Sequence, residues 1–350
     1  MRAVVARHDQ AVLVRDRPKP RLRDDCVLVK VAAVALNPTD WKHLAGKFVP
    51  DGCLIGCDFA GHVEEVGKGV TKSWSKGDRI AGTVHGGHAS QPDDGAFADY
   101  IVAKGDLCLK IPLAMSLEKA ATLPLGVGTV MQGLYQKGLK MNQPDNPVKE
   151  QTFVLIYGGS TATGALGIQF AKLSGYTVIS TCSKKNIDYV KGLGADKVFD
   201  YNEEPNTVGH RIREFTRNRL RLAWDLVCSS ESAHVCSEAL SSDGTGCRYA
   251  SFLANKSPRK DVVSVGTNLY TMWGESFKVG QLEYAASQED FNWGTRFMVL
   301  VENVISQGRV RPHQEIVMQH GLAGVSGGLE MLRHGGVSGG KLVYRIEDTP

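Results

Sequence analysis

The sequence predicts an α/β protein that combines a β-rich region with a doubly wound parallel sheet. First, the apolar run Phe153–Tyr157 meets a glycine-rich turn, 158–164, followed by apolar residues at helical spacing. This pattern is typical of a strand buried on both faces that leads into a helix. Second, strand and helix patterns alternate after this turn, whereas the region before about residue 115 holds mainly short alternating runs. Strands that alternate with helices indicate right-handed crossovers and a parallel sheet.

Composition limits the class of protein. The chain has 350 residues, of which 42% are hydrophobic and 22% charged, and this length allows two domains with a core each. The net charge of +4 is too small to indicate nucleic-acid binding, and no apolar run approaches the roughly 20 residues of a membrane span. Arg2 and Arg7 interrupt the N-terminus, so we expect no secretory signal. Eight scattered cysteines without a C-x-x-C spacing fit reduced thiols in a cytoplasmic enzyme.

The N-terminal region is expected to be β-rich, because short apolar or alternating runs are separated by Gly, Pro and Asp clusters. The expected strands are Ala3–Ala6, Cys26–Leu36, Gly61–Val66, Arg79–Val84 and Phe97–Val102. Residues 86–95 show no period and predict a loop. Ser116 is a suitable N-cap for a helix, and a helical pattern follows at Thr129–Leu139.

The turn after Phe153–Tyr157 resembles a dinucleotide fingerprint. Gly159-x-Thr161-x-x-Gly164 fits G-x-G-x-x-G if Thr161 replaces the second glycine. A strand, a tight turn and a helix start present free backbone N–H groups and a positive dipole end to a pyrophosphate. We therefore expect the cofactor to be bound by Gly159, Ser160, Thr161, Ala162, Thr163 and Gly164, with the threonine hydroxyl donating to the phosphate.

The next strand predicts which cofactor is bound. Thr177–Thr181 reads as the second strand, and Ser183, Lys184 and Lys185 follow it in place of an acidic residue. A carboxylate here would accept from the ribose 2′-hydroxyl of NAD, whereas a hydroxyl and two ammonium groups bind a 2′-phosphate. The alternative, two lysines at an exposed helix start, is disfavoured by the helix dipole. The sequence therefore predicts NADPH.

The rest of the chain continues the alternation and then returns to strands. The expected elements are helix Asn186–Leu193, strand Lys197–Asp200, helix Gly209–Leu220, strand Ala223–Cys228, helix Ala233–Leu240, strand Cys247–Leu253 and helix Phe291–Ser306. Residues 309–350 are expected to form strand-like runs that end at Lys341–Ile346.

Several segments resemble the medium-chain dehydrogenase/reductase superfamily. They are Gly61–Val70, Lys76–Ile80, the turn 158–164 and Gly339–Val343. The resemblance covers nearly the whole chain. It implies a GroES-like β-rich substrate domain formed by residues 1–117 and 309–350, a Rossmann NADP-binding domain formed by residues 118–308, and an active-site cleft at their junction.

Within this superfamily the chain is most similar to fungal trans-acting enoyl reductases, of which the lovastatin-type enzyme is the best-known kind. The segments that carry this similarity are Ala35–Lys42, Gly56–Gly61, Gly158–Gly164 and Val337–Arg345. The resemblance implies NADPH-dependent reduction of an enoyl thioester held by the acyl-carrier domain of a polyketide synthase. One alternative is a zinc-free quinone or enone oxidoreductase that acts on small free substrates. Another is a non-catalytic NADPH-binding protein like the lens crystallins of this superfamily.

The positions of zinc ligands in the zinc-dependent branch differ in this chain. That branch has a cysteine at the position of Asn37 and a His-Glu pair at Cys57 and Asp58. Asn37 is a poor zinc ligand, and a catalytic zinc needs three protein ligands. Residues 85–100 lack the four cysteines of a structural zinc lobe. His85 and His88 are expected to be solvated in their glycine-rich loop. We therefore expect no metal, and we expect NADPH to reduce an acceptor that is already activated by conjugation.

The resemblance also implies which residues face the substrate. Lys42 would supply a charge for an enolate or for the phosphopantetheine arm, and Thr129 a hydroxyl; the alternatives are a surface lysine and a buried helix residue bonded to its own backbone. Asn37 and Asp40 would border the substrate or only tie their loop together. Tyr201 resembles a tyrosine placed against the 2′-phosphate, with packing alone as the alternative.

Three further features remain open. Trp273 and Phe277 would line the acyl pocket or simply pack at a domain junction. The run 210–221 contains five arginines, which indicate either docking of an acidic carrier domain or, more commonly, the solvated face of an amphipathic helix. A monomer is slightly favoured over a homodimer by the resemblance to trans-acting reductases.

Overall fold

The computed structural model describes residues 1–252 and 255–350, which form two compact units. The first unit comprises residues 1–125 and 270–350, and the second comprises residues 126–269. Leu253, the last residue of one predicted strand, lies outside the described residues. Residues 270–308 were expected in the nucleotide-binding domain, whereas compactness groups them with the first unit because helix α8 (Gln288–Ser306) packs against β7. The expected domain boundaries remain a prediction.

The first unit contains a seven-stranded sheet with the order β16-β17-β3-β4-β5-β7, in which β6 also pairs with β3. Its strands are β3 (Cys26–Ala35), β4 (Asp58–Val66), β5 (Arg79–Thr83), β6 (Tyr100–Lys104), β7 (Leu109–Lys110), β16 (Glu315–Met318) and β17 (Lys341–Arg345). Two hairpins, β1 (Ala3–Arg7) with β2 (Gln10–Val14) and β14 (Phe277–Val279) with β15 (Leu282–Tyr284), complete its strands. The strands predicted near Cys26, Gly61, Arg79 and Lys341 are therefore present.

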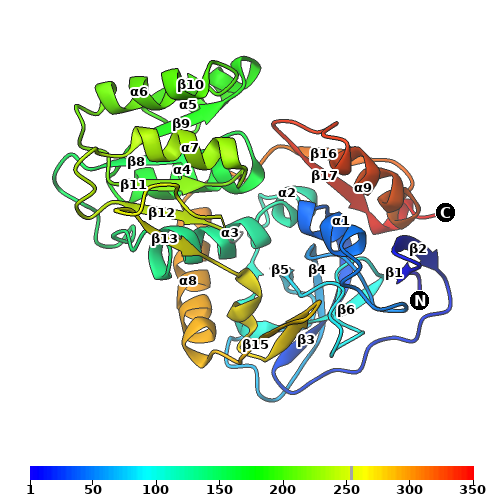
Figure 1. Ribbon diagram of the computed structural model, residues 1–350. Helices are drawn as coiled ribbons and strands as arrows, with labels where there is room; N and C mark the ends of the chain where they lie inside the picture. Colours follow the sequence, from blue (N-terminus) through cyan, green and yellow to red (C-terminus); the bar gives the residue numbers. More distant parts are fainter. Residues whose placement is uncertain (253–254) are drawn as a thin grey trace. The chain divides into compact units, whose positions relative to one another are not determined.

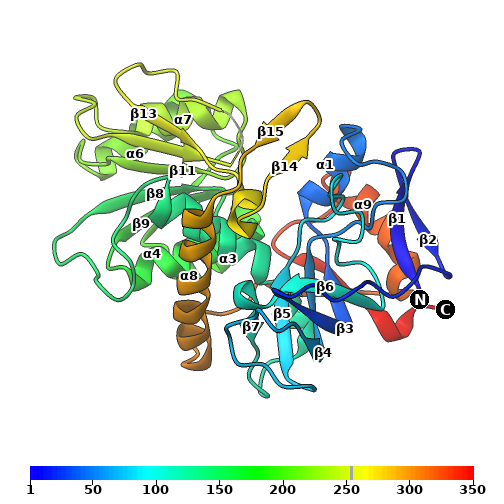
Figure 2. The ribbon, with the colours of Figure 1, turned by 90° about the horizontal axis from the view of Figure 1, so that it is seen from below.

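Both ends of the chain lie in this unit. Strand β17 pairs antiparallel with β3, so that Val343 lies opposite Ala35. The Arg2 guanidinium binds Asp99 at 3.0 Å and donates to the Thr349 carbonyl oxygen at 2.6 Å. Figures 1 and 2 accordingly show the N- and C-termini close together. The β-rich unit cannot be completed until the last residues of the chain have been added.

Two helices of the first unit were not predicted. Helix α1 (Pro38–Ala45) follows β3 directly, and its proline occupies an early helical position, where the missing N–H costs nothing. Helix α9 (Val325–Arg333) lies where strand-like runs were expected, so that expectation was wrong for this segment. Its buried Val325 and Leu329 are four residues apart, on one helix face. The expected helix start at Ser116 is present, since its side chain caps α2 (Leu117–Ala121).

The second unit contains a six-stranded parallel sheet, which confirms the predicted doubly wound architecture. Its order is β10-β9-β8-β11-β12-β13, the arrangement of two mononucleotide-binding halves that meet at β8 and β11. The strands are β8 (Phe153–Tyr157), β9 (Thr177–Cys182), β10 (Lys197–Asp200), β11 (Leu222–Asp225), β12 (Arg248–Ser251) and β13 (Val263–Gly266). The bounds of β8 and β10 are those predicted.

Helices cover both faces of the parallel sheet. They are α4 (Ala162–Leu173), α5 (Ile187–Gly192), α6 (Pro205–Phe215) and α7 (Ser230–Ala239). Val208 of α6 and Ala233 of α7 share a core with Leu155 of β8. Gly167 of α4 instead approaches Trp224 and Ile156, whose side chains point to the other face because strand side chains alternate. Figure 2 shows α4 and α7 on opposite sides of the strands.

One further helix joins the two units in sequence. Helix α3 (Pro124–Val130) continues into a π-helical segment, Met131–Gln136, which covers most of the predicted helix Thr129–Leu139. Within residues 1–252 and 255–350, no helix combines the length and apolar character needed to cross a membrane.

Candidate cofactor and catalytic sites

The turn between β8 and α4 is held by the backbone and by one side chain. Gly158 has φ of +91°, a conformation that side chains other than glycine rarely adopt. Thr161 caps α4: its hydroxyl accepts from the Gly164 N–H at 3.0 Å and donates to the Gly158 carbonyl oxygen at 2.8 Å. The hydroxyl hydrogen is therefore used within the turn. In this structure Thr161 does not have the expected free hydroxyl hydrogen for a phosphate.

The geometry of the turn fits a pyrophosphate. A Cβ atom on Gly159 would lie 2.1 Å from the Ser180 hydroxyl oxygen, and one on Gly164 would lie 2.3 Å from the Gly158 carbonyl oxygen. Only glycine fits these close approaches of the turn to β9 and of the helix to the turn. Ala162 and Thr163 occupy the first two positions of α4, where the helix supplies no acceptor for their N–H groups. These donors, at a strand order that reverses between β8 and β11, suit a dinucleotide.

The expected 2′-phosphate group of residues lies at the ends of neighbouring strands. Strand β9 ends at Cys182, after which Ser183 is half-buried and Lys184 and Lys185 are exposed. The Tyr201 N–H donates to the Cys182 carbonyl oxygen at 3.3 Å, which places Tyr201 beside this segment. The Tyr201 side chain is 40% exposed, so it is available to a ligand. A hydroxyl, two ammonium groups and an aromatic ring thus lie on one edge of the second unit.

One carboxylate also lies at this edge. Asp200, which pairs with Cys182 in the sheet, accepts from the Asn202 backbone N–H at 3.0 Å and from its side-chain amide at 2.7 Å. This carboxylate is therefore occupied by its own turn. The charge at the end of β9 itself remains positive, as the sequence indicates.

In the first unit, Asn37, Asp40 and Lys42 belong to the start of α1. Asn37 is the N-cap, and its backbone N–H donates to the Asp40 carboxylate at 2.7 Å. Burial raises the pKa of Asp40 to about 7. Lys42 is exposed, with its ammonium 5.8 Å from the Trp41 ring centroid. The arrangement supports a loop-tying role for Asn37 and Asp40 and leaves Lys42 accessible.

The positions that bind zinc in other branches are linked by hydrogen bonds here. Asp58 is fully buried and accepts from the Asn37 side-chain amide at 3.0 Å and from the Lys341 ammonium at 2.5 Å. The described residues contain no group of three or more His, Cys, Asp or Glu side chains suited to a metal ion. That no metal is needed stays a prediction.

The two loop histidines correct an expectation. His85 and His88 are buried, each 4% exposed, and not solvated. His88 Nδ1 accepts from the N–H groups of Ser90 and Gln91 at 3.1 and 3.2 Å, so this ring caps its own turn. His85 stacks on Tyr270 with ring centroids 3.9 Å apart. The loop is ordered by these contacts, which the glycine-rich sequence does not reveal.

Trp273 and Phe277 lie in an aromatic cluster of the first unit, while Thr129 lies in α3. Both aromatic side chains are buried, and Phe277 meets the His85 ring edge-on at 5.2 Å. Phe277 also stacks on Tyr284, with centroids 4.6 Å apart. Thr129 is 7% exposed. Both aromatic side chains are therefore packed within the first unit.

The sequence did not predict several buried polar groups and the hydrogen bonds that they form. Tyr270 lies 2.8 Å from Thr39, hydroxyl to hydroxyl, and Asp225 at the end of β11 accepts from the hydroxyls of Tyr249 and Ser232, each at 2.7 Å. An acid within an apolar run, such as Asp225 in Leu222–Leu226, is the available signal, because a buried carboxylate requires donors.

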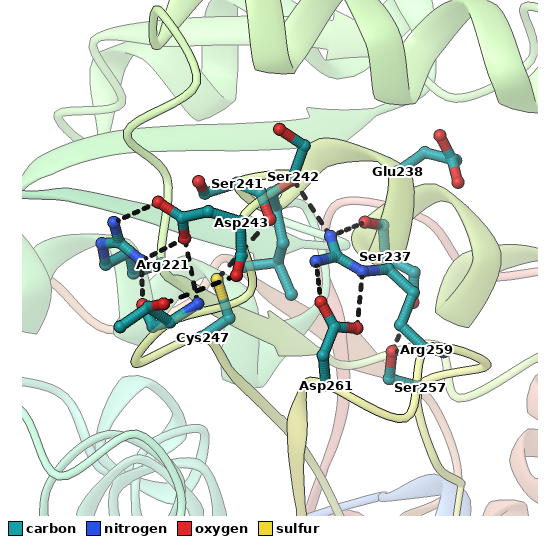
Figure 3. Close-up of polar contacts among 12 residues, drawn as sticks. Arg221, Ser237, Glu238, Ser241, Ser242, Asp243, Cys247, Ser257, Arg259 and Asp261 are labelled. Atoms are coloured by element: carbon teal, nitrogen blue, oxygen red, sulfur yellow. Dashed lines mark hydrogen bonds and ion pairs between the residues drawn. The ribbon is translucent and has the colours of Figure 1, made fainter.

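The arginine-rich segment is largely engaged with its own unit. Arg211 pairs with Glu203, Arg213 donates to the Leu240 carbonyl oxygen at 3.2 Å, and Arg219 donates to Gln151 at 2.9 Å. The Arg221 guanidinium donates two hydrogen bonds to the Asp243 carboxylate, of 2.9 and 3.0 Å (Figure 3). Beside it, Arg259 pairs with Asp261. These contacts favour a structural role over the docking of an acidic partner.

Comparisons with known proteins extend over almost the whole chain. Residues 23–113 match the family described as alcohol dehydrogenase GroES-like domain, and residues 162–284 match the zinc-binding dehydrogenase family. The trans-enoyl reductase resD of Aspergillus sclerotiorum is 47% identical over 353 residues, covering 96% of this chain and 97% of that protein. The enoyl reductase component lovC of the lovastatin nonaketide synthase of Aspergillus terreus is 37% identical, covering 97% and 94%. Among solved structures, mycobacterial Rv1454c complexed with NADPH has a TM-score of 0.73 at 21% identity, covering 98% and 99%.

Proposed function

The chain belongs to the trans-enoyl reductase family of the medium-chain dehydrogenase/reductase superfamily, and from that membership we propose that it reduces polyketide intermediates with NADPH. It is an oxidoreductase that uses a nicotinamide cofactor. The substrate is an α,β-unsaturated thioester held by the acyl-carrier domain of a synthase. The observation that carries this proposal is 47% identity to a trans-enoyl reductase over 96% of the chain.

Each part of the proposed site has a distinct task. The nicotinamide, when bound, would supply a hydride for the β-carbon of the acceptor, and the α-carbon then takes a proton from solvent. The N–H groups of Ala162 and Thr163 hold the pyrophosphate, and the glycines at 159 and 164 allow the tight packing of the turn that presents these groups. Ser183, Lys184, Lys185 and Tyr201 hold the 2′-phosphate. This charge pattern supports NADPH over NADH because ammonium groups bind a phosphate dianion more strongly than a ribose hydroxyl.

The substrate side of the site depends on charge and positioning. We assign Lys42 to stabilise the negative charge that develops on the thioester oxygen, or to hold the phosphopantetheine arm, and we assign Thr129 to donate a hydrogen bond to the substrate. The exposed ammonium of Lys42 supports this assignment. Asn37 and Asp40 border the substrate through the loop that they tie. We keep Trp273 and Phe277 as lining residues of the acyl pocket.

The partner of the enzyme is a polyketide synthase. We propose that the phosphopantetheine arm of its carrier domain delivers the substrate, and that the reductase acts as a monomer. The trans-acting relatives support delivery by the carrier domain, because a separate reductase must visit a carrier that belongs to another chain. Eight free thiols support a reducing, cytosolic setting. Light scattering coupled to gel filtration measures the oligomeric state.

The test of the function is absorbance at the NADPH band in stopped flow. We expect rapid oxidation of NADPH with crotonyl-type thioesters of pantetheine or coenzyme A, and slow oxidation with free quinones. NADPH oxidation with quinones alone would reject the polyketide assignment and favour a quinone reductase. Tight NADPH binding without turnover of either class would indicate a binding protein.

Matched variants test the cofactor assignment in the same experiment. Lys184→Ala/Lys185→Ala removes both ammonium groups and should raise the Kd for NADPH by about tenfold or more while changing the Kd for NADH by less than about threefold. Lys172→Ala, which removes an exposed lysine paired with Asp196, is the control and should leave both Kd values unchanged. Equal weakening for the two cofactors would contradict the 2′-phosphate assignment.

A further inference from the structure

In the first unit, Asp58 accepts hydrogen bonds from the N-cap residue of α1 and from the backbone N–H of Leu125. Asp58 is the first residue of β4 and has no exposed surface. One carboxylate oxygen accepts from the Asn37 side chain at 3.0 Å and from the Lys341 ammonium at 2.5 Å, and the other accepts from the Leu125 backbone N–H at 2.8 Å. Three segments that are far apart in the sequence therefore form hydrogen bonds to one side chain.

One of these segments carries a proposed catalytic residue. Asn37 is the N-cap of α1, and Lys42 lies in that helix. Leu125 lies in the first turn of α3 and is the last residue of this part of the first unit. A carboxylate at the N-terminus of α3 is favoured by the helix dipole. Asp58 is thus hydrogen-bonded to the first turn of one helix and to the cap of the other.

Lys341 makes this arrangement possible by balancing the charge. Both members of the pair are buried, with side-chain exposures of 3% for Lys341 and 0% for Asp58. A buried carboxylate without a cation is strongly disfavoured. Lys341 begins β17, so the C-terminal strand supplies the counter-charge to a residue that anchors the start of α1.

We propose that Asp58, neutralised by Lys341, is a positioning residue that fixes the start of helix α1, which carries Lys42. The inference rests on the proposed function for the role of Lys42. Misplacing a catalytic group by about 1 Å can cost about a hundredfold in rate. Loss of the anchor should therefore lower kcat with little effect on cofactor binding, which depends on the turn after β8.

The test uses Asp58→Leu/Lys341→Met in the full-length chain. This double variant leaves no buried charge and removes the oxygen that accepts from the Asn37 side-chain amide, so the link to α1 is lost; the Leu125 N–H loses this acceptor as well. The control is Asp99→Asn, which weakens the Arg2–Asp99 pair elsewhere in the same unit. We expect kcat with crotonyl-pantetheine to fall at least about tenfold in the double variant and less than about threefold in the control. The Kd for NADPH should stay within about twofold in both.

Hydrogen exchange provides a readout that does not depend on turnover. Peptides that cover 37–45 should exchange faster in the double variant than in Asp99→Asn, because the N-cap has lost its anchor. If kcat of the folded double variant stays near wild type, or if exchange at 37–45 equals that of the control, the proposal is wrong. If the wild type reduces no thioester, the proposed function fails, and the exchange of 37–45 still decides whether Asp58 anchors α1.

Discussion

At the scale of single residues, the first unit depends on acids that sequence inspection would place on a surface. Asp40 and Asp58 are both buried, within and next to the segment that supplies Lys42. Asp58 has a cation, whereas one oxygen of Asp40 is buried without a hydrogen-bond partner. Burial is accordingly the main cause that raises the pKa of Asp40, with the nearby Asp58 charge adding to it.

Asp40 should make the protein less stable as pH rises. Its pKa is about 7 in the folded state against an ordinary value of 3.8, so the folded state binds this proton more tightly than the unfolded state. The unfolding free energy should therefore fall between about pH 4 and pH 7. Urea unfolding of wild type and Asp40→Asn at pH 5 to 8 measures this. We expect the wild type to lose at least about 1 kcal/mol relative to the variant over this range. Parallel curves would contradict it.

Residue pairings show where prediction from sequence stops. Ser183, Lys184, Lys185 and Tyr201 could be grouped in advance because parallel strands present their carboxyl ends at the same edge of a sheet. Asp58 and Lys341 could not, since they are 283 positions apart and a single sequence holds no signal for such a distant pair. The stacking of His85 on Tyr270 is likewise a contact between residues that are remote in sequence.

At the scale of elements, the strength of the local pattern decided what could be predicted. Strand β8 and the end of α8 were located to the residue because β8 is a fully buried apolar run and α8 has a long helical period. Strand β10 was located from its place between two helical patterns, since only one of its four residues is buried. Helix α1 has eight residues, and α9 contains Gly327 and Gly328, which have poor helix propensity. Tertiary packing of Val325 and Leu329 stabilises α9 where propensity does not.

The cap of α4 gives a test of what Thr161 does. Thr161→Ala removes the acceptor of the Gly164 N–H and should lower the unfolding free energy by about 1 kcal/mol, whereas Thr161→Ser keeps the hydroxyl and should stay near wild type. Thermal unfolding without cofactor measures the effect. The NADPH affinity of Thr161→Ala should fall only slightly, because the variant loosens the turn without removing a group that binds the phosphate. Normal stability of the alanine variant with a large loss of NADPH affinity would instead show that the hydroxyl serves the phosphate.

At the scale of the whole molecule, each unit has a different relation to chain order. The second unit is one continuous segment that contains every strand of its parallel sheet. The first unit places β17, from the end of the chain, against β3 from its beginning. Leu342 and Tyr344 of β17 share a core with Val34 and Leu36. The early part of this unit is thus left without a neighbouring strand, a counter-charge for Asp58 and part of its core until the chain is complete.

Fragments of the chain should therefore fold unequally. Residues 126–269 hold a complete sheet with helices on both faces, so this fragment should give a dispersed amide NMR spectrum and cooperative thermal unfolding. Residues 1–125 alone leave β3 without β17 and Asp58 without Lys341, and this fragment should remain largely unfolded. Folding would leave apolar surface exposed to water and the buried Asp58 carboxylate without its cation. Adding residues 270–350 as a second chain should restore dispersion to the N-terminal fragment. The same C-terminal fragment carrying Lys341→Met is the matched control, and it should restore the fold less well because it leaves the Asp58 charge unpaired. An N-terminal fragment that folds by itself would show that β17 only covers a sheet that is already stable.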